Sequence, residues 1–240
     1  GDIEIREAIE QSCNYYFNMV GFKLGQDAEG NFSENRSLSV LQKYASEIGL
    51  DKKTGIEITE SAPQVSNSLA VPSYIGQGTN AYTTSQLARY ATAIATSGNV
   101  YDLTLLDRQT NSRGETLKEY EPEIINTIDV SSNVWDDIHD GMYRVVQTHS
   151  QFDGLGVDVA GKTGTAEVDG VYHPNHGMFI GYAPASSPQY AIAVRIENGY
   201  SSGNACLAAD DIFKYIFELQ DEKSILTGVA ASDTSDTSND

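Results

Sequence analysis

The chain has 240 residues, which is enough for one substantial domain or for a core with a small satellite. It carries 34 acidic and 15 basic residues, and its formal net charge is −19 at pH 7. A field of that sign opposes binding to nucleic acid and to anionic membrane surfaces. The sequence contains no apolar run of the about 18 residues that a membrane-spanning helix needs. We therefore expect no nucleic-acid partner and no membrane span within this chain.

Two helices are predicted at the start of the chain, on either side of a short break at Ser12-Cys13-Asn14. Apolar residues recur at helical spacing from Ile5 up to the break, and the pattern resumes after it until Gly25. A third helix is predicted over residues 38–48, because its apolar positions share one face and Gly49 follows. Residues 54–82 are rich in Gly and Pro and are expected to form turns.

The next predicted helix begins with Thr83, which forms a capping-box pair with Gln86, and it continues to Ser97. Residues 101–107 and 116–128 are predicted to be extended, because a turn signal separates two β-prone segments.

In the last third of the chain, the sequence pattern predicts a helix, three strands and a second helix. Residues 134–145 have one apolar face, which predicts an amphipathic helix. Three strands are predicted at 157–168, 176–182 and 190–197, and a closing helix at 205–219. Short loops join the strands, so the sheet is expected to be antiparallel.

The order of these elements predicts a layered α/β (α+β) fold, in which helices flank an antiparallel sheet. Residues 1–222 are assigned to this folded part. Residues 223–240 are acidic and of low complexity, and they are predicted to be a disordered tail.

The most informative segment is Lys162-Thr163-Gly164-Thr165, which lies within the predicted strand 157–168. A lysine at a strand edge supplies positive charge for a carboxylate. Gly164 lets a substrate backbone lie close, since no side chain intervenes. The hydroxyl of Thr165 can bind the same carboxylate, and its N–H can face a developing oxyanion. The alternative is a strand with one solvent-facing lysine, and this segment alone does not decide between the two.

Lys-Thr-Gly combined with Ser-x-x-Lys and a Ser-x-Asn-type triplet is a known acyl-transfer signature. Context separates the Ser-x-Asn triplets in this chain. The triplet at Ser12 lies between two predicted helices, whereas the others lie at helix ends or in loops. The triplets begin at Ser12, Ser33, Ser97, Ser131 and Ser202.

No metal or cofactor is expected. His173-Pro174-Asn175-His176 has the spacing of a metal site, but the proline breaks a helical arrangement and no third ligand is evident. A turn between strands is predicted there instead.

Several segments, in the order of the family, resemble class B (monofunctional) penicillin-binding proteins, and they cover most of residues 1–219. One departure is Thr84-Ser85, where the family usually has Thr-Pro. The final segments are more similar to elongation-type members. The segments are AIEQSCNYYFNMVGFKLG, YASEIGLDKKTGIEI, YIGQGTNAYTTSQLARYATAIATSG, AGKTGTAE, NHGMFIGYAP and YAIAVRIENGY.

The resemblance implies the penicillin-binding/serine β-lactamase-like transpeptidase fold and a D,D-transpeptidase that cross-links peptidoglycan stem peptides ending in D-Ala-D-Ala. β-Lactam antibiotics would acylate the same serine. Ser12 would relay a proton, Asn14 would bind the acyl amide, and Lys162 would supply charge near Ser12. Thr163, Gly164 and Thr165 would form the substrate-binding strand.

The nucleophile of that mechanism is not found in this chain, because no Ser-x-x-Lys occurs in the 240 residues. Ser33 precedes Arg36 at the right spacing, but arginine does not accept a proton. We therefore expect a missing N-terminal part of the same protein to complete the fold and to carry the nucleophile and the membrane anchor. The chain alone would then be inactive. The resemblance places the protein at the extracytoplasmic face of the bacterial membrane. The alternative function is a non-catalytic β-lactam receptor or cell-wall scaffold of the same fold.

Overall fold

A computed structural model describes residues 3–166 and 174–226. The chain divides into two compact units. Unit 1 combines Gly1–Tyr16 with Val130–Asp240, and unit 2 is Phe17–Asp129. The folded part predicted for residues 1–222 thus contains two units, and the Ser12 and Lys162 segments both belong to unit 1.

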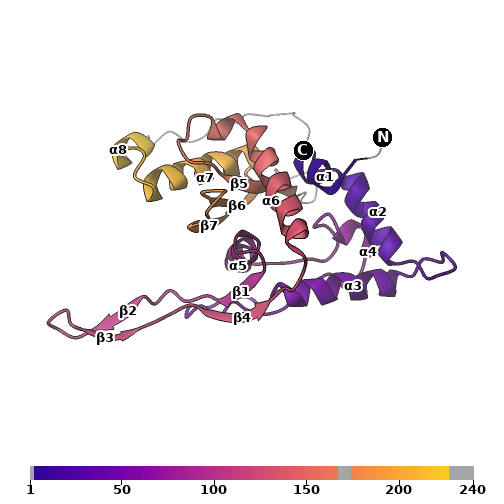
Figure 1. Ribbon diagram of the computed structural model, residues 1–240, viewed down its shortest axis with the longest axis horizontal. Coiled ribbons are helices and arrows are strands. Elements are labelled where there is room, and N and C mark those ends of the chain that lie inside the picture. Colours follow the sequence, from indigo (N-terminus) through magenta and orange to yellow (C-terminus); the bar gives the residue numbers. More distant parts are fainter. Residues whose placement is uncertain (1–2, 167–173, 227–240) are drawn as a thin grey trace. The chain divides into compact units, whose positions relative to one another are not determined.

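Unit 1 is built on a three-stranded antiparallel sheet in the order β5-β6-β7 (Figure 1). The strands are β5 (Ala160–Ala166), β6 (His176–Ala183) and β7 (Tyr190–Ile196). The antiparallel pairing is confirmed, with Lys162 opposite Ile180 across the β5–β6 pair. The strand expected at 157–168 begins three residues later than predicted, and its last two residues lie outside the described part of the chain.

Helices flank this sheet, as the order of elements predicted. Helix α7 packs against β6 and β7, and α6 packs against β5 and α1. The helical segments of unit 1 are α1 (Ile5–Glu10), α6 (Ser132–Gln147), the 3₁₀ turn η1 (Ser150–Phe152), α7 (Ser202–Ile216) and α8 (Glu222–Ile225).

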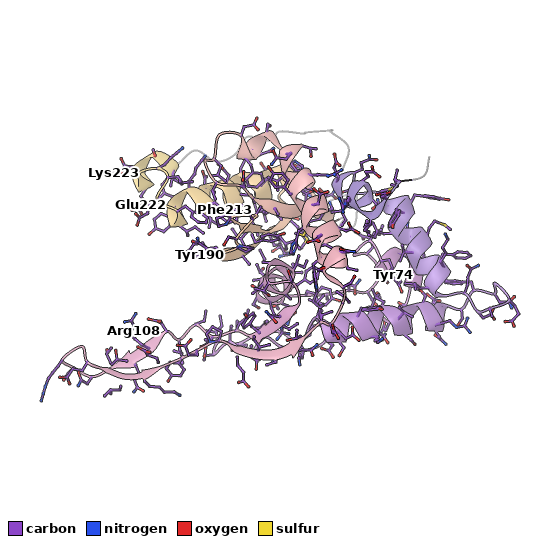
Figure 2. All side chains as sticks on the ribbon, viewed as in Figure 1. Tyr74, Arg108, Tyr190, Phe213, Glu222 and Lys223 are labelled. Carbon is purple, nitrogen blue, oxygen red and sulfur yellow. The ribbon has the colours of Figure 1, made fainter. Side chains whose placement is uncertain are left out.

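The core of unit 1 lies between the sheet, α7 and the segment around η1. Phe179 of β6 and Phe213 of α7 are fully buried in it, and Figure 2 labels Phe213 on its helix. Phe179 also packs on Phe152 of η1, with ring centroids 5.2 Å apart. Burying aromatic side chains of this size contributes about 2 to 3 kcal/mol each, so this core holds the sheet and α7 together.

Helix α8 covers three residues that the sequence assigned to the acidic tail. It spans Glu222–Ile225, whereas the tail was predicted to begin at residue 223. Its capping residue is Asp221, and its exposed side chains include Glu222 and Lys223. Residues 227–240 of the predicted tail lie outside the described residues.

Unit 2 contains four helical segments, and the predicted break before α2 is confirmed. Thr83 caps α5 through the predicted capping box, because its hydroxyl accepts from the Gln86 N–H while the Gln86 side chain accepts from Thr83 N–H. The segments are α2 (Asn14–Leu24), which starts at the boundary of unit 1, α3 (Glu34–Glu47), α4 (Ala70–Ser73) and α5 (Thr84–Ala95).

The segments predicted as extended in unit 2 form two short antiparallel ribbons. β1 (Asn99–Asp102) pairs with β4 (Glu123–Thr127), and β2 (Arg108–Thr110) pairs with β3 (Thr116–Glu119). The second ribbon is exposed throughout and carries Arg108, which Figure 2 labels. Of the segment predicted at 101–107, only residues 101 and 102 lie in a strand, because residues 103–107 connect β1 to β2. The segment predicted at 116–128 is divided between β3 and β4.

None of the helices in residues 3–166 and 174–226 has the length and apolar character needed to cross a bilayer.

Candidate active site

The turn that joins α1 to α2 positions Ser12. Helix α1 ends in a Schellman-type cap, in which Ser12 N donates to Ile9 O at 3.2 Å and Cys13 N donates to Ala8 O at 2.9 Å. This cap requires a left-handed residue, and Ser12 has φ 47°. Glycine is the usual residue there, and a side chain costs about 1 to 2 kcal/mol in this conformation. The strained position therefore favours a role for the Ser12 hydroxyl.

Lys162 of β5 reaches Ser12. Its ammonium donates to the Ser12 hydroxyl, and it also donates to Thr163 O at 3.0 Å and reaches Thr163 Oγ1 at 3.5 Å. Both Ser12 and Lys162 are partly buried. The structure therefore brings together two of the predicted catalytic residues, within one compact unit.

Strand β5 forms one edge of the sheet. Strand β5 ends the order β5-β6-β7, so among the described residues its far side has no strand partner. Exposed N–H and C=O groups on such an edge can pair with an extended peptide.

Packing among the described residues does not account for the glycine at position 164. A Cβ at Gly164 would meet Met178 Cβ at an ordinary 3.7 Å. At Gly161, by contrast, a Cβ would lie 2.3 Å from the Phe179 ring. Close packing thus explains the glycine at 161 but not the one at 164, which fits a glycine that leaves room for a bound molecule.

Thr163 and Thr165 lie on the same strand as Lys162 and are partly buried. Thr165 pairs with Gly177 of β6. Asn14 is the first residue of α2 and is exposed, and within the described residues no hydrogen bond joins it to Ser12 or Lys162. The structure thus places Asn14 two residues from Ser12 without a direct link to the lysine.

The other Ser-x-Asn triplets occupy structural positions. Ser33 caps α3 by accepting from Arg36 N, and Ser131 is the residue before α6. Ser97 follows α5, and Ser202 begins α7 rather than lying in a loop as predicted. The triplet at Ser12 differs from these four because its serine accepts a hydrogen bond from the lysine of the Lys-Thr-Gly strand, and its catalytic role stays a prediction.

The departure at Thr84-Ser85 has a local explanation in unit 2. Ser85 Oγ donates to Glu60 Oε1 at 2.5 Å, which a proline ring could not do. Thr83 Oγ1 donates to the same oxygen at 3.1 Å, and Thr54 N donates to Glu60 Oε2 at 2.7 Å. Burial raises the pKa of Glu60, but these hydrogen bonds outweigh it and lower the pKa below its ordinary value. The sequence carried no signal for this buried carboxylate.

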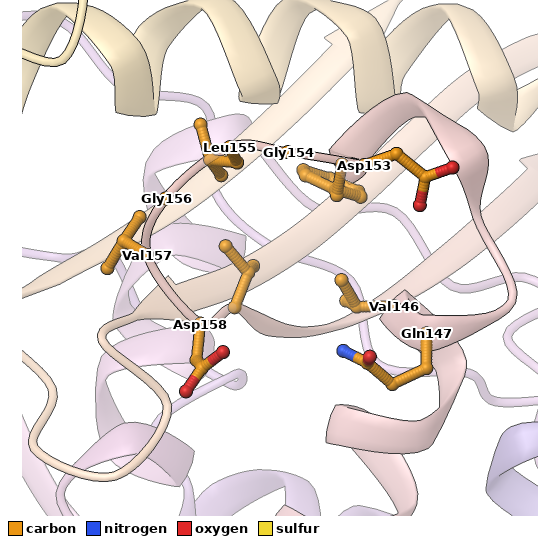
Figure 3. A pocket seen from close by; sticks show the side chains of 10 residues that line it. Val146, Gln147, Asp153, Gly154, Leu155, Gly156, Val157 and Asp158 are labelled. Carbon is orange, nitrogen blue, oxygen red and sulfur yellow. The ribbon is translucent and has the colours of Figure 1, made fainter.

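A hollow of about 420 Å³ in unit 1 lies away from these residues. Gln147 lines it together with the glycine-rich segment that runs from Phe152 to Val159, as Figure 3 shows. It includes neither Ser12 nor Lys162, so it is not the candidate site. Within residues 3–166 and 174–226 no three His, Cys, Asp or Glu side chains gather to hold a metal ion. His173 of the histidine segment lies outside the described residues.

Comparison with known proteins shows a family whose model matches most of the chain. The family described as "Penicillin binding protein transpeptidase domain" matches residues 1–218. The "Peptidoglycan D,D-transpeptidase MrdA" of Acinetobacter baumannii is 27% identical over 90% of the chain. That match covers 34% of the relative, so the chain spans about a third of its length.

Solved structures have the same fold. Penicillin-binding protein 2B of Streptococcus pneumoniae R6 superimposes with a TM-score of 0.76 at 23% identity, covering 92% of this chain and 40% of that one. The ceftriaxone acyl-enzyme complex of penicillin-binding protein A from M. tuberculosis gives a TM-score of 0.74 at 25% identity, covering 92% and 50%.

Proposed function

The chain belongs to the penicillin-binding protein transpeptidase domain family, and from that premise we propose that it forms part of a peptidoglycan D,D-transpeptidase. The observation that carries the proposal is the hydrogen bond from Lys162 to Ser12, because it joins two of the three motifs of the acyl-transfer signature. The substrate is a stem peptide ending in D-Ala-D-Ala, and β-lactam antibiotics are its mimics.

The proposed reaction is acyl transfer through a serine ester. The serine oxygen attacks the carbonyl of the penultimate D-alanine, the peptide C–N bond breaks, and the terminal D-alanine leaves with a proton delivered to its nitrogen. The amine of a neighbouring peptide then attacks the ester. The new amide cross-links the two peptides, and the serine recovers its proton. In a β-lactam the ring C–N bond opens in the same first step, but the leaving group stays attached.

Each site residue has a proposed role in these steps. Ser12 relays the proton toward the leaving nitrogen, and Lys162 holds the Ser12 hydroxyl in place and adds positive charge. Asn14 binds the amide of the acyl group. Thr165 binds the terminal carboxylate through its hydroxyl and the oxyanion through its N–H, on an edge that Gly164 keeps open. Thr163 supports Lys162 from the next position of β5.

We propose that the acylated serine belongs to sequence outside these 240 residues, since they contain no Ser-x-x-Lys. That missing N-terminal part is then a partner of the site. The proposal places the protein at the outer face of the bacterial membrane and in cell elongation. The name of the A. baumannii relative favours an enzyme over a non-catalytic β-lactam receptor.

Labelling with a fluorescent penicillin tests the proposal on the complete gene product. We expect stoichiometric labelling of the native protein and a loss of about a hundredfold or more in rate for Lys162→Ala. Lys23→Ala, an exposed lysine in the last turn of α2, serves as the matched control and is expected to label at the native rate. Peptide mapping is expected to locate the adduct upstream of this chain.

Three results would overturn different parts of the proposal. If Lys162→Ala is labelled at the native rate, the assignment of Lys162 to the active site is wrong. An adduct on a serine within the 240 residues would remove the assignment of the nucleophile to outside sequence. Failure of the native protein to take up any penicillin would remove the transpeptidase function itself.

A further inference from the structure

Helix α1, which precedes Ser12, depends on its neighbours for its position. Helix α1 has only six residues, which is far below the length at which an isolated helix is stable in water. Its own cap is local, with Glu4 N donating to the Glu7 carboxylate at 2.7 Å. Ala8 is fully buried. The location of α1, and of Ser12 after it, is therefore decided by the element against which it packs, which is α6.

The two helices touch at Gly141 of α6. A Cβ at this position would lie 2.9 Å from Ile9 Cβ and 3.2 Å from Arg6 O. Real Cβ atoms do not approach other carbons so closely, so any larger residue would push α1 away from α6. The glycine thus sets how near α1 lies to its support.

Charged side chains flank this contact at both ends of α1. Arg6 Nε and Nη2 both lie 2.6 Å from Asp137 Oδ1, and Arg6 Nη1 lies 3.5 Å from Asp140 Oδ2. Arg144 Nη2 lies 2.8 Å from Asp140 Oδ2, and its Nη1 lies 3.8 Å from Glu10 Oε2. Two anchored ends limit both the rotation and the sliding of a short helix.

These ion pairs add little to stability, since their side chains are between 30% and 42% exposed. Pairs this exposed contribute about 0 to 1 kcal/mol each. We expect these ion pairs to matter for the orientation of α1 rather than for stability, because a six-residue helix does not fix its own orientation.

The same α6 also supports the lysine. Its buried side chains include Trp135 and Met142, and α6 packs against β5, the strand that carries Lys162. One helix therefore holds Ser12 through α1 and Lys162 through β5. A change in the α1–α6 contact would be transmitted to the distance between the Ser12 hydroxyl and the Lys162 ammonium.

We propose that Gly141, Arg6 and Asp137 are positioning residues that hold Ser12 in register with Lys162, with α6 as the common support. This inference rests on the proposed function, since it assigns a purpose to the Ser12–Lys162 pair. Displacements of about 1 Å in a reacting geometry can cost about a hundredfold in rate.

Gly141→Ala in the complete gene product is the sharpest test. We expect the acylation rate constant for a fluorescent penicillin to fall about tenfold to a hundredfold, with the dissociation constant of the initial non-covalent complex unchanged. Alanine is the better helix former by about 1 kcal/mol, so the Tm is expected to stay within a few degrees of native. Asn133→Ala, an exposed position of the same helix, is the matched control and is expected to label normally.

The ion pair is tested separately. We expect Arg6→Ala to slow acylation about tenfold and Arg6→Lys to restore part of the loss, because lysine keeps the charge but not the fork of two N–H donors. Asp137→Ala should slow acylation as much as Arg6→Ala does. The double variant should be acylated no more slowly than either single variant. Lys43→Ala, which removes an exposed ion pair with Glu47, is the control.

The outcomes distinguish this inference from the proposed function. If Lys162→Ala abolishes labelling while the Gly141 and Arg6 variants label at the native rate, the positioning role is wrong and the site stands. If slower labelling follows only a fall in Tm, the contact is merely structural and the inference is also wrong. If Lys162→Ala is labelled at the native rate, the proposed function is wrong, and the inference that rests on it is wrong as well.

Discussion

Lys162 donates a hydrogen bond to Ser12, a residue 150 positions earlier in the chain. The lysine comes from an edge strand, and the serine comes from a left-handed turn between two helices. Neither local setting alone indicates catalysis. Together they place a hydroxyl and a positive charge side by side in a partly buried position, where electrostatic interactions are stronger than in bulk water.

Replacing Ser12 separates stability from chemistry. Ser12→Gly should raise the free energy of unfolding by about 1 kcal/mol, because glycine accepts the left-handed conformation without strain. Ser12→Ala keeps the strain and should leave stability nearly unchanged. Both remove the hydroxyl, so both should slow penicillin labelling of the complete gene product strongly. Equal labelling by the glycine variant and the native protein would show that the strained turn serves packing only.

The two glycines of β5 should respond oppositely to alanine. Gly164→Ala places a Cβ in ordinary contact with Met178, so the free energy of unfolding in urea should change by less than about 0.5 kcal/mol. The rate of labelling by a fluorescent penicillin should nevertheless fall. Gly161→Ala forces a Cβ into Phe179 and should cost about 1 to 3 kcal/mol or more. A Gly164→Ala protein that labels normally would mean that ligands do not approach β5 at this point.

Acid should destabilise unit 2 through Glu60. The folded-state pKa of Glu60 lies below its ordinary value, so its contribution to stability is present above the unfolded pKa of about 4.3 and is lost as the pH falls through the lower folded value. Glu60→Gln should flatten that part of the pH dependence. It should also cost about 1 to 3 kcal/mol at pH 7, since one amide oxygen cannot accept from all the donors.

Thermal or urea unfolding from pH 7 to pH 3 checks this prediction. Glu123→Gln, an exposed carboxylate on β4, is the matched control and should unfold like the native protein at pH 7. If the stability of Glu60→Gln and that of the native protein depend on pH in the same way, Glu60 does not cause the loss of stability in acid.

Arg89 should be one of the most sensitive positions of unit 2. Its guanidinium is fully buried and donates to the carbonyl oxygens of Gly49, Lys52 and Lys53, at 2.6 Å to Lys52 O and 3.0 Å to Lys53 O. Arg89→Met leaves these buried acceptors unpaired, and we expect a loss of about 3 to 5 kcal/mol in urea unfolding. Arg108→Met on the exposed β2–β3 ribbon should change stability by less than about 0.5 kcal/mol. Similar losses of stability for both variants would refute the role of Arg89 in pairing these buried carbonyl groups.

Much of the secondary structure could be read from local patterns. The break at Ser12-Cys13-Asn14, the capping box at Thr83 and the antiparallel strands follow from spacing, turn residues and loop length, which act over a few residues. Boundaries were less accurate, as at β5 and α7, because a helix or strand ends where tertiary hydrogen bonds end.

The site was predicted only in part. The Ser-x-Asn pattern occurs five times in the chain, so the pattern does not distinguish one triplet from another. Ser12 was selected by the predicted helices on either side of it and by the resemblance to a family. The contact of Gly141 with Ile9 and the ion pairs of Arg6 left no trace in the pattern, since each depends on the crossing of two helices far apart in sequence. The buried carboxylate of Glu60 was missed because its partners Thr83 and Ser85 lie 23 and 25 residues further along the chain.

The order of the elements, the candidate triplet at Ser12 and the Lys-Thr-Gly strand were predicted from side-chain periodicity and short motifs, together with the resemblance to a family. The resemblance implied that Lys162 lies near Ser12, but the hydrogen bond between them, the left-handed conformation of Ser12 and the support of both by α6 are features of the folded chain. Those features depend on the packing of α1 and β5 against a common helix, and packing between distant segments is not encoded in any one stretch of the chain.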